Sequence, residues 1–194
     1  MNRESIFDAV REMLGRSFTS SEVFALDSAI DRAMGDAPAL TLGLKGTALI
    51  KEFEGLAKVR PDGKVEAYPD PATGGAPWTI GYGSTGPDIK KGAVWTKEQA
   101  ERRFAEHSAE FAAKVAKLLG DTPTTQEQFD AMVSLAYNVG MGNFAGSTLL
   151  KKHKAGDHKG AAAEFARWNR ANGKAMAGLT RRRAAEAKLY RGQP

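Results

Sequence analysis

The stretch EAYPDPATGGAPWTIGYGST, residues 66–85, decides the fold predicted for this 194-residue chain. Its prolines and glycines indicate turns, whereas residues 78–82 have the aromatic and β-branched side chains of a strand. Upstream, Pro61-Asp62-Gly63 separates two short runs that are typical of paired strands. The sequence therefore predicts a small antiparallel sheet, with Asp70 beside a turn and Thr79 on a strand.

The residues around this sheet have a helical pattern. A short helix is predicted to start at Thr47 and to stop at a glycine at position 55, which leaves Glu54 on its last turn. Four further helix starts are predicted, the first two from capping boxes, at Thr96/Gln99, Thr124/Glu127, Asp157 and Thr180. The fold class is therefore α+β, mostly helical with one small antiparallel sheet.

Residues 1–38 form a separate unit in the sequence. Apolar side chains recur at helical spacing in residues 6–14, and a capping box at residues 19–22 starts a second helix. The glycines and proline of the stretch GDAPALTLGLKG, residues 35–46, are typical of a linker, with a boundary near residues 36–43. We expect a helical hairpin appendage at 1–38 that packs on a main domain at 39–194.

Composition excludes several kinds of site and anchor. The chain has no cysteine, which rules out thiol nucleophiles, thiolate zinc sites and disulfides. Its three histidines, His107, His153 and His158, lack metal-ligand spacing, so neither a metal nor a cofactor is expected. No apolar run reaches 18 residues and no signal peptide is recognised, so we expect a protein made in the cytoplasm without a membrane anchor.

Positive charge is concentrated in the C-terminal part of the chain. Residues 151–194 carry 12 Lys and Arg against 3 Asp and Glu, whereas residues 1–38 carry 4 against 7. The basic segment is either a solvated helical surface or a binding surface for a polyanion such as nucleic acid, anionic lipid or cell wall. Charge alone leaves these alternatives open.

Carboxylates are the best candidates for chemistry. Glu54 lies near a helix C-terminus, whose partial negative charge favours the protonated form of a carboxyl group. A lone glutamate in this position is usually a surface residue, so Glu54 needs a partner, and Asp62 and Asp70 are the candidates. Asp62 is explained by the Asp-Gly turn, and Asp70 can likewise be a turn residue before Pro71.

Three ordered motifs decide between these readings. EFEGL at 52–56, AYPD at 67–70 and WTIGYGST at 78–85 resemble the motifs of phage T4-type lysozymes, glycoside hydrolase family 24. SLAYNVG, FAGSTLLKK and GLTRRRAAEAKLY, which start at positions 134, 144 and 178, resemble the C-terminal lobe of the same endolysins. The resemblance covers residues 44–191 but not 1–38, and it implies a lysozyme-like fold.

The resemblance implies that Glu54, Asp70 and Thr79 are the catalytic residues. An inverting mechanism is implied, with Glu54 as the acid, Asp70 as the base and the Thr79 hydroxyl helping to hold the water. The spacings from Glu54 to Asp70 and from Asp70 to Thr79 are both longer than in the family pattern, which leaves Asp62 as an alternative base. Ser84 also replaces a histidine that is common in the family.

The resemblance further suggests substrate contacts and an ion pair. Tyr82, Tyr137 and Asn138 are candidate substrate-binding residues; the alternatives are core packing for the tyrosines and helix capping for Asn138. The arginines at 181–183 cannot all face one way on a helix. We expect two of them in solvent and one turned inward, where it pairs with Glu54.

The function implied is that of an endolysin-type muramidase, which cleaves the β-1,4 bond between N-acetylmuramic acid and N-acetylglucosamine in bacterial peptidoglycan. The enzyme is expected to be a monomer that binds no nucleic acid and reaches the wall when a holin opens the host membrane. One rival is a lytic transglycosylase, which needs no water-activating Asp and Thr. The other is a noncatalytic basic wall-binding module. Glu54, Asp70 and Thr79, in this order, argue against both.

Overall fold

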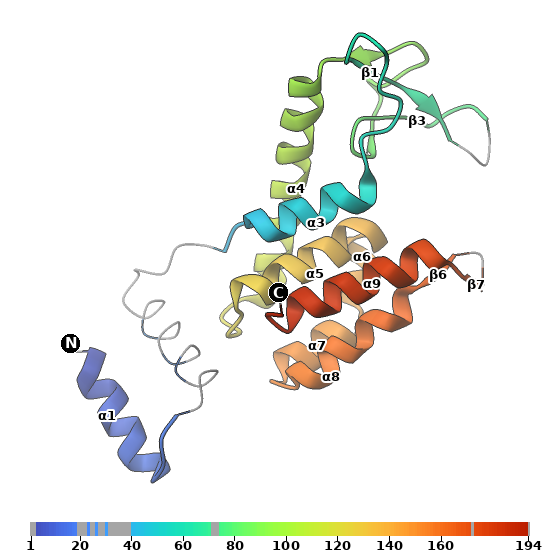
Figure 1. Cartoon of the computed structure of the whole chain (residues 1–194). Coiled ribbons are helices and arrows are strands. Elements are labelled where there is room, and N and C mark those ends of the chain that lie inside the picture. The colour runs from blue at the N-terminus through green and yellow to red at the C-terminus, as the bar shows by residue number, and fades with distance from the viewer. Residues whose placement is uncertain are drawn as a thin grey trace.

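The computed structural model describes residues 3–18, 23, 26, 30, 40–70, 74–171 and 173–193. A helical lobe and a smaller lobe of short strands are joined by the long helix α4 (Lys97–Leu119), as Figure 1 shows. The other helices of these residues are α1 (Arg3–Leu14), α3 (Leu44–Glu54), α5 (Gln126–Val139), α6 (Met141–Ala145), α7 (Thr148–Lys154), α8 (His158–Glu164), the 3-10 helix η1 (Phe165–Trp168) and α9 (Ala177–Tyr190). The predicted α+β class is confirmed.

The strands are short and antiparallel. They are β1 (Val65–Glu66), β2 (Tyr68–Pro69), β3 (Trp78–Ile80), β4 (Ser84–Thr85), β5 (Val94–Trp95), β6 (Arg170–Ala171) and β7 (Lys174–Ala175). Strands β2, β3 and β4 form one sheet, whereas β1 pairs with β5 and β6 with β7. The hairpin predicted around residues 61–63 is reduced to one bridge, between Val59 and Val65, because β1 pairs with the distant β5. The sequence did not predict the β6–β7 pair.

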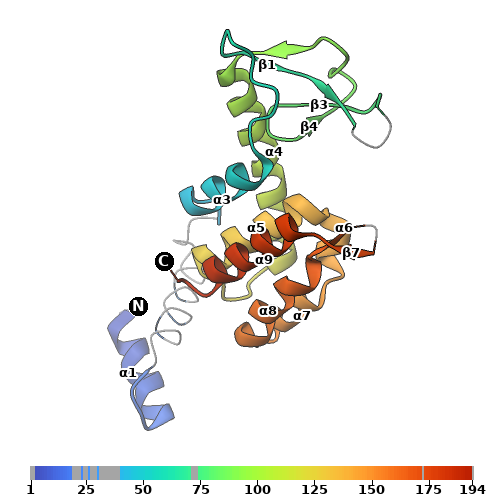
Figure 2. The same ribbon diagram turned by 45° about the vertical axis from the view of Figure 1, so that its right-hand side comes forward.

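Helix α5 is the centre of the helical lobe. Every residue from 129 to 136 is buried, so two turns of this helix have no solvent face. Helices α3, α4 and α9 pack against it, and α9 lies alongside α5 in both views (Figure 2). A second, smaller core holds the strands against the N-terminal end of α4 and consists of Val65, Ala67, Ile80, Ile89 and Ala100. The two cores place α3 at the junction of the lobes.

Asp130 on α5 determines where α3 begins. Its carboxylate is 1% exposed and accepts hydrogen bonds from the N–H groups of Gly43 and Gly46, at 2.8 and 2.9 Å. A negative charge at a helix N-terminus is stabilising, so α3 starts at Leu44 and not at the predicted Thr47. Only glycine fits at position 46, because a Cβ there would lie 2.8 Å from the Asp130 Cβ atom.

Two of the other helix starts differ from the prediction, by one and by three residues, and the start at Asp157 is confirmed. The capping box at Thr96/Gln99 is confirmed. The next one lies at Thr125/Gln128, one residue later than predicted, because Thr124 is buried and its hydroxyl group donates to a backbone carbonyl. Helix α9 starts three residues earlier than predicted. These differences move no residue of the candidate site off its predicted element.

The N-terminal unit begins as predicted. Helix α1 ends at Gly15, which has a positive φ of 63°, and the rings of Phe7 and Phe18 then meet edge to face at 5.7 Å. Positions 23, 26 and 30 are helical, and the rest of the second predicted helix lies outside the described residues. Figures 1 and 2 show α1 apart from the helical lobe. Within the described part of the chain, no helix is long and apolar enough to cross a membrane.

Candidate active site

Glu54 lies where the two lobes meet. Helix α3 ends with this residue, and the Gly55 N–H closes the helix on the Lys51 carbonyl. The Arg182 Nη1 atom donates a 2.7 Å hydrogen bond to Glu54 Oε1, and the Glu54 side chain is 20% exposed. The other oxygen faces the β3–β4 turn, because a Cβ built on Gly83 would lie 3.3 Å from Glu54 Oε2. The carboxyl group therefore lies between α9 and the sheet.

The arginines of α9 correct the sequence prediction. Arg182 and Arg183 are both buried, at 3% and 1% exposure, and only Arg181 is in solvent. The buried carboxylate of Glu186 explains this result, since it accepts from Arg182 Nε at 3.2 Å and from Arg183 Nη2 at 2.9 Å. Ser134 on α5 also donates to Glu186, at 2.8 Å. Arg182 thus connects Glu54 to a charged group buried inside the protein.

Burial changes the proton affinity of this cluster. Desolvation lowers the pKa of Arg183 to about 10, although the charge of Glu186 opposes the change. Desolvation also raises the pKa of the Glu186 carboxyl, against the opposing effect of both arginines. Such groups are retained inside a protein when they are paired. The cluster therefore holds the Arg182 side chain, and with it Glu54, in one place.

The register of β2 and β3 places Asp70 and Thr79 on the same face of the sheet. Tyr68 pairs with Thr79, and the Asp70 N–H continues the ladder by donating to the Pro77 carbonyl at 3.2 Å. Because side chains alternate along a strand, Tyr68, Asp70 and Thr79 share a face. Burial, and next the charge of Glu54, raise the pKa of Tyr68 on this face.

Asp62, the alternative base, lies in the turn that the Asp-Gly pair predicts. Its Oδ1 atom accepts from the Lys64 N–H at 3.2 Å and lies 3.5 Å from Arg60 Nε. The Asp62 side chain is 43% exposed. These contacts are local to the turn and account for an aspartate at this position.

A cavity of about 840 Å³ opens beside Glu54 on the side of the helical lobe. Asn138, Arg181 and Arg182 line it together with the end of α3 and the start of α9. The Asn138 Oδ1 atom accepts a hydrogen bond from Arg183 Nη2 at 3.0 Å, so this side chain does not cap α5, which ends at Val139 and is capped by Gly140. Asp70 and Thr79 do not line this cavity and lie on the sheet.

Two tyrosines connect the lobes. The Tyr137 hydroxyl donates to the Tyr82 carbonyl at 3.3 Å, and the Tyr137 ring packs on Phe104 and His107. Burial, and next the charge of Glu54, raise the pKa of Tyr137 to about 12. Tyr82 is 7% exposed and its hydroxyl donates to Glu101 at 2.7 Å. The geometry favours the packing alternative for Tyr82, whereas Tyr137 lies within the electrostatic reach of Glu54.

The phage lysozyme family model matches residues 51–186. This match spans more than half of the chain and includes Glu54, Asp70 and Thr79. The chain belongs to the phage lysozyme family. The resemblance noted in the sequence is confirmed.

Similar proteins agree with this family. The endolysin of Acyrthosiphon pisum secondary endosymbiont phage 1 is 43% identical over 150 residues, which cover 75% of this chain and 94% of that protein. The endolysin of Bacillus phage B103 is 41% identical over 78% of this chain, which spans about half, 54%, of its length. The solved muramidase domain of SpmX from Asticaccaulis excentricus has a TM-score of 0.66 at 35% identity, over 77% of this chain and 96% of that domain.

The predicted pairing of one of the arginines 181–183 with Glu54 is confirmed, but the prediction did not specify Arg182 or include Glu186, which is buried beside it. Their spacing of four residues along α9 was a signal, since it brings the two side chains to one helical face. The spacing does not say that this face is buried. Among the residues that the structure describes, no group of three or more His, Asp or Glu is placed to hold a metal ion.

Proposed function

We propose that the chain hydrolyses the β-1,4 bond between N-acetylmuramic acid and N-acetylglucosamine in bacterial peptidoglycan, with inversion at the sugar carbon. The observation that carries the proposal is the position of Glu54, held by Arg182 and facing the sheet side that bears Asp70 and Thr79. Membership of the phage lysozyme family supports the same assignment.

In the proposed reaction, Glu54 donates its proton to the glycosidic oxygen as the bond to the sugar breaks. A water molecule attacks the sugar carbon from the opposite face, and Asp70 takes the proton of that water. The Thr79 hydroxyl can both donate and accept, so it can hold the water in line. The ion pair with Oε1 fixes the Glu54 carboxyl group and leaves Oε2 on the side of the sheet.

We also propose that the sugar chain crosses the junction of the lobes. The cavity beside Glu54 is large enough for sugar units, and Asn138 lies in its wall. Tyr137 lies nearby, on the link between α5 and the sheet. Asn138 and Tyr137 are therefore proposed as substrate contacts. Tyr82 is proposed as a residue that holds Tyr137 in place, since its carbonyl accepts the Tyr137 hydrogen bond.

Substitution of the carboxylates tests the assignment. Glu54→Gln is expected to abolish lysis of purified walls, because general acid catalysis contributes roughly 10²- to 10⁴-fold. Asp70→Asn is expected to be severe, and Asp62→Asn, the matched control in an exposed turn, to be mild. The reverse order for the two aspartates would assign the base to Asp62. Full activity of Glu54→Gln in a folded variant would refute the proposal.

Product analysis tests the type of reaction. Hydrolysis leaves reducing N-acetylmuramic acid ends on the digested peptidoglycan, which mass spectrometry identifies. A transglycosylase leaves 1,6-anhydro ends, and their presence would transfer the chain to that class. The optical rotation of the first products distinguishes inversion from retention.

The remaining proposals concern partners and location. We propose that the enzyme acts as a monomer, that its exposed C-terminal cations bind the anionic envelope and not nucleic acid, and that it reaches the wall from the host cytoplasm through a holin lesion. Co-expression with and without a holin tests the route, because lysis without a holin would contradict it. Size-exclusion chromatography with light scattering tests the monomer.

A further inference from the structure

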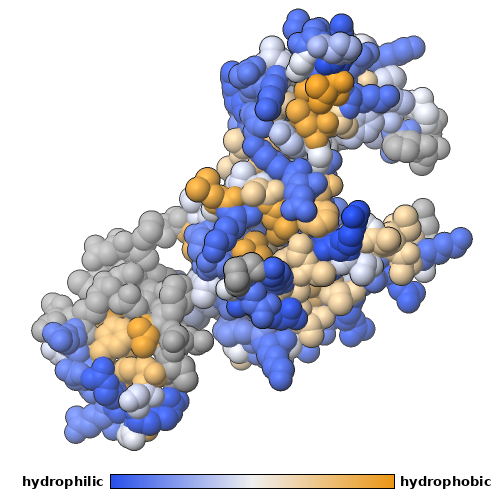
Figure 3. Space-filling view, viewed as in Figure 1, coloured by the Kyte–Doolittle hydropathy of each residue, from blue (hydrophilic) through white to orange (hydrophobic). Residues whose placement is uncertain are grey.

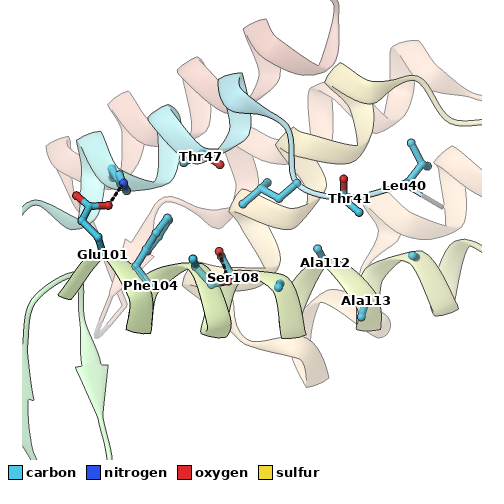
Figure 4. Close-up of a pocket in the computed structure, with 13 residues that line it drawn as sticks. Leu40, Thr41, Thr47, Glu101, Phe104, Ser108, Ala112 and Ala113 are labelled. Carbon is cyan, nitrogen blue, oxygen red and sulfur yellow. Dashed lines mark hydrogen bonds and ion pairs between the residues drawn. The ribbon is translucent and has the colours of Figure 1, made fainter. Parts of the chain in front are cut away.

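An apolar groove of about 570 Å³ lies between α3 and α4, away from Glu54 (Figure 4). Exposed alanines of α4 form its floor, and Thr47 and Lys51 of α3 lie on the opposite side. The floor alanines are Ala105, Ala109 and Ala113, which recur at every fourth residue and so face the same way. Their small side chains let another helix come close. Exposed apolar surface of this kind marks an interaction site.

The N-terminal unit has a matching unpaired surface. Met13 is 86% exposed and Leu14 is 43% exposed, and Figure 3 shows an apolar patch on α1. The half-buried Ile6, Phe7 and Val10 continue this stripe along the helix. Phe7 packs on Phe18 within the unit, whereas Met13 and Leu14, at the end of the stripe, are exposed and lack the packing that stabilises most helices in proteins.

The chain itself brings this helix to the groove. Leu40 and Leu42 line one edge of the groove, and Leu40 is the first described residue after the N-terminal unit. Residues 19–39 connect α1 to this edge along the sequence. A helix tethered at the groove edge has an effective concentration in the millimolar range.

Charge complementarity selects the same occupant. Residues 1–38 carry 4 Lys and Arg against 7 Asp and Glu, whereas the whole chain has a net charge of +5, so the main domain is strongly positive. Lys114 and Lys117 are exposed on α4 next to the floor of the groove. The N-terminal unit, which is acidic as a whole, is therefore attracted to this side of the domain.

We propose that α1, which lies apart from the helical lobe in this structure, docks with its apolar face in the α3–α4 groove of its own chain. The docked helix bridges α3, which ends in Glu54, and α4, which joins the lobes. It stabilises the junction of the lobes without entering the site. The proposal is independent of the hydrolase assignment, because it concerns binding within the chain.

Cross-linking tests the position of α1, and the absence of cysteine from the chain makes the test clean. The full-length variant Met13→Cys with Ala109→Cys is treated with a flexible bis-maleimide. The control pairs Met13→Cys with Glu110→Cys, because Glu110 is also exposed but lines a polar pocket on another face of α4. We expect the first pair to form an intramolecular cross-link at least about tenfold faster, at a rate independent of protein concentration.

Equal rates for the two pairs would overturn the proposal. Cross-links found only between molecules would overturn it too, since they would assign the groove to a second copy of the chain.

Thermal unfolding of Met13→Gln, Ala109→Gln and the double variant gives an independent check. Both sites are exposed and glutamine is a good helix former, so folding is retained. Docking predicts that each single substitution lowers Tm by at least about 2 °C. The Tm of the double variant should be no lower than that of a single variant, because both substitutions remove the same contact. Additive or absent shifts would contradict docking.

Discussion

Removal of the Arg182 guanidinium group tests how the buried cluster holds the acid. The guanidinium is 3% exposed and donates to two carboxylates, at 2.7 Å to Glu54 and 3.2 Å to Glu186, and lies 3.4 Å from the Ser134 carbonyl. Arg182→Met fills a similar volume but leaves Glu54 without this cation. Breaking one side of a buried ion pair costs about 3–5 kcal/mol, which corresponds to a Tm decrease of roughly 10 °C in a chain of this size.

Activity is expected to fall as well, because the Glu54 carboxyl group loses the contact that positions it. A displacement of about 1 Å at a reacting group can cost 100-fold. Calorimetry and wall lysis measured below the Tm of the variant separate the two effects. Arg181→Met is the matched control, since Arg181 is the exposed neighbour on the same helix and its loss is expected to leave Tm nearly unchanged.

Arg182→Lys refines the test. A lysine keeps the positive charge but lacks the planar fork that reaches both carboxylates at once. We expect Tm between those of the parent and the methionine variant, with activity still reduced. The reasoning would be refuted if Arg182→Met and Arg181→Met had the same Tm and the same activity.

Three further predictions concern other parts of the chain. Burial lowers the pKa of His153 to about 4 from 6.5, so the unfolded state binds more protons between these values. Stability should fall by up to about 3 kcal/mol as pH drops from 6.5 to 4, and urea unfolding should show a steeper fall in the parent than in His153→Gln. Asp130→Asn should lower the unfolding free energy by about 2 kcal/mol, against almost no change for the exposed Asp121→Asn, because it weakens two hydrogen bonds at the start of α3. Lysis of whole walls should fall steeply as the salt concentration rises above the physiological value, at which the Debye length is ~8 Å, while cleavage of short neutral glycans changes little. The test substitutes glutamine for four exposed lysines, Lys151, Lys159, Lys174 and Lys188. An unchanged salt profile in that variant would show that these cations only solubilise the chain.

The basic tail shows how tertiary structure changes a sequence count. Arg182 and Arg183 contribute to the positive charge of residues 151–194, yet both are buried and serve the site. Lys152 is half-buried and lies 3.5 Å from Glu164, so it is less available to a polyanion than the sequence suggests. The remaining cations still outnumber the acids on the exposed surface of this segment.

Local patterns in the sequence determined the class of protein and the elements that carry its chemistry. The absence of cysteine, the order of Glu54, Asp70 and Thr79, and the capping box at residue 96 depend on residue type and short spacing alone. Such signals act over a few residues, so they are readable before the chain folds.

Long-range packing decided what these signals could not. Asp130 determines the start of α3 although the two are 84 residues apart in the sequence. Strand β1 pairs with the distant β5 and not with the segment just before residues 61–63. Glu186 holds two arginines inside the protein, where one was predicted. Each outcome depends on which groups meet when distant segments bury their apolar faces together. The free energy of such contacts comes from burial and from pairing charges away from water, and neither is defined until the tertiary structure has formed.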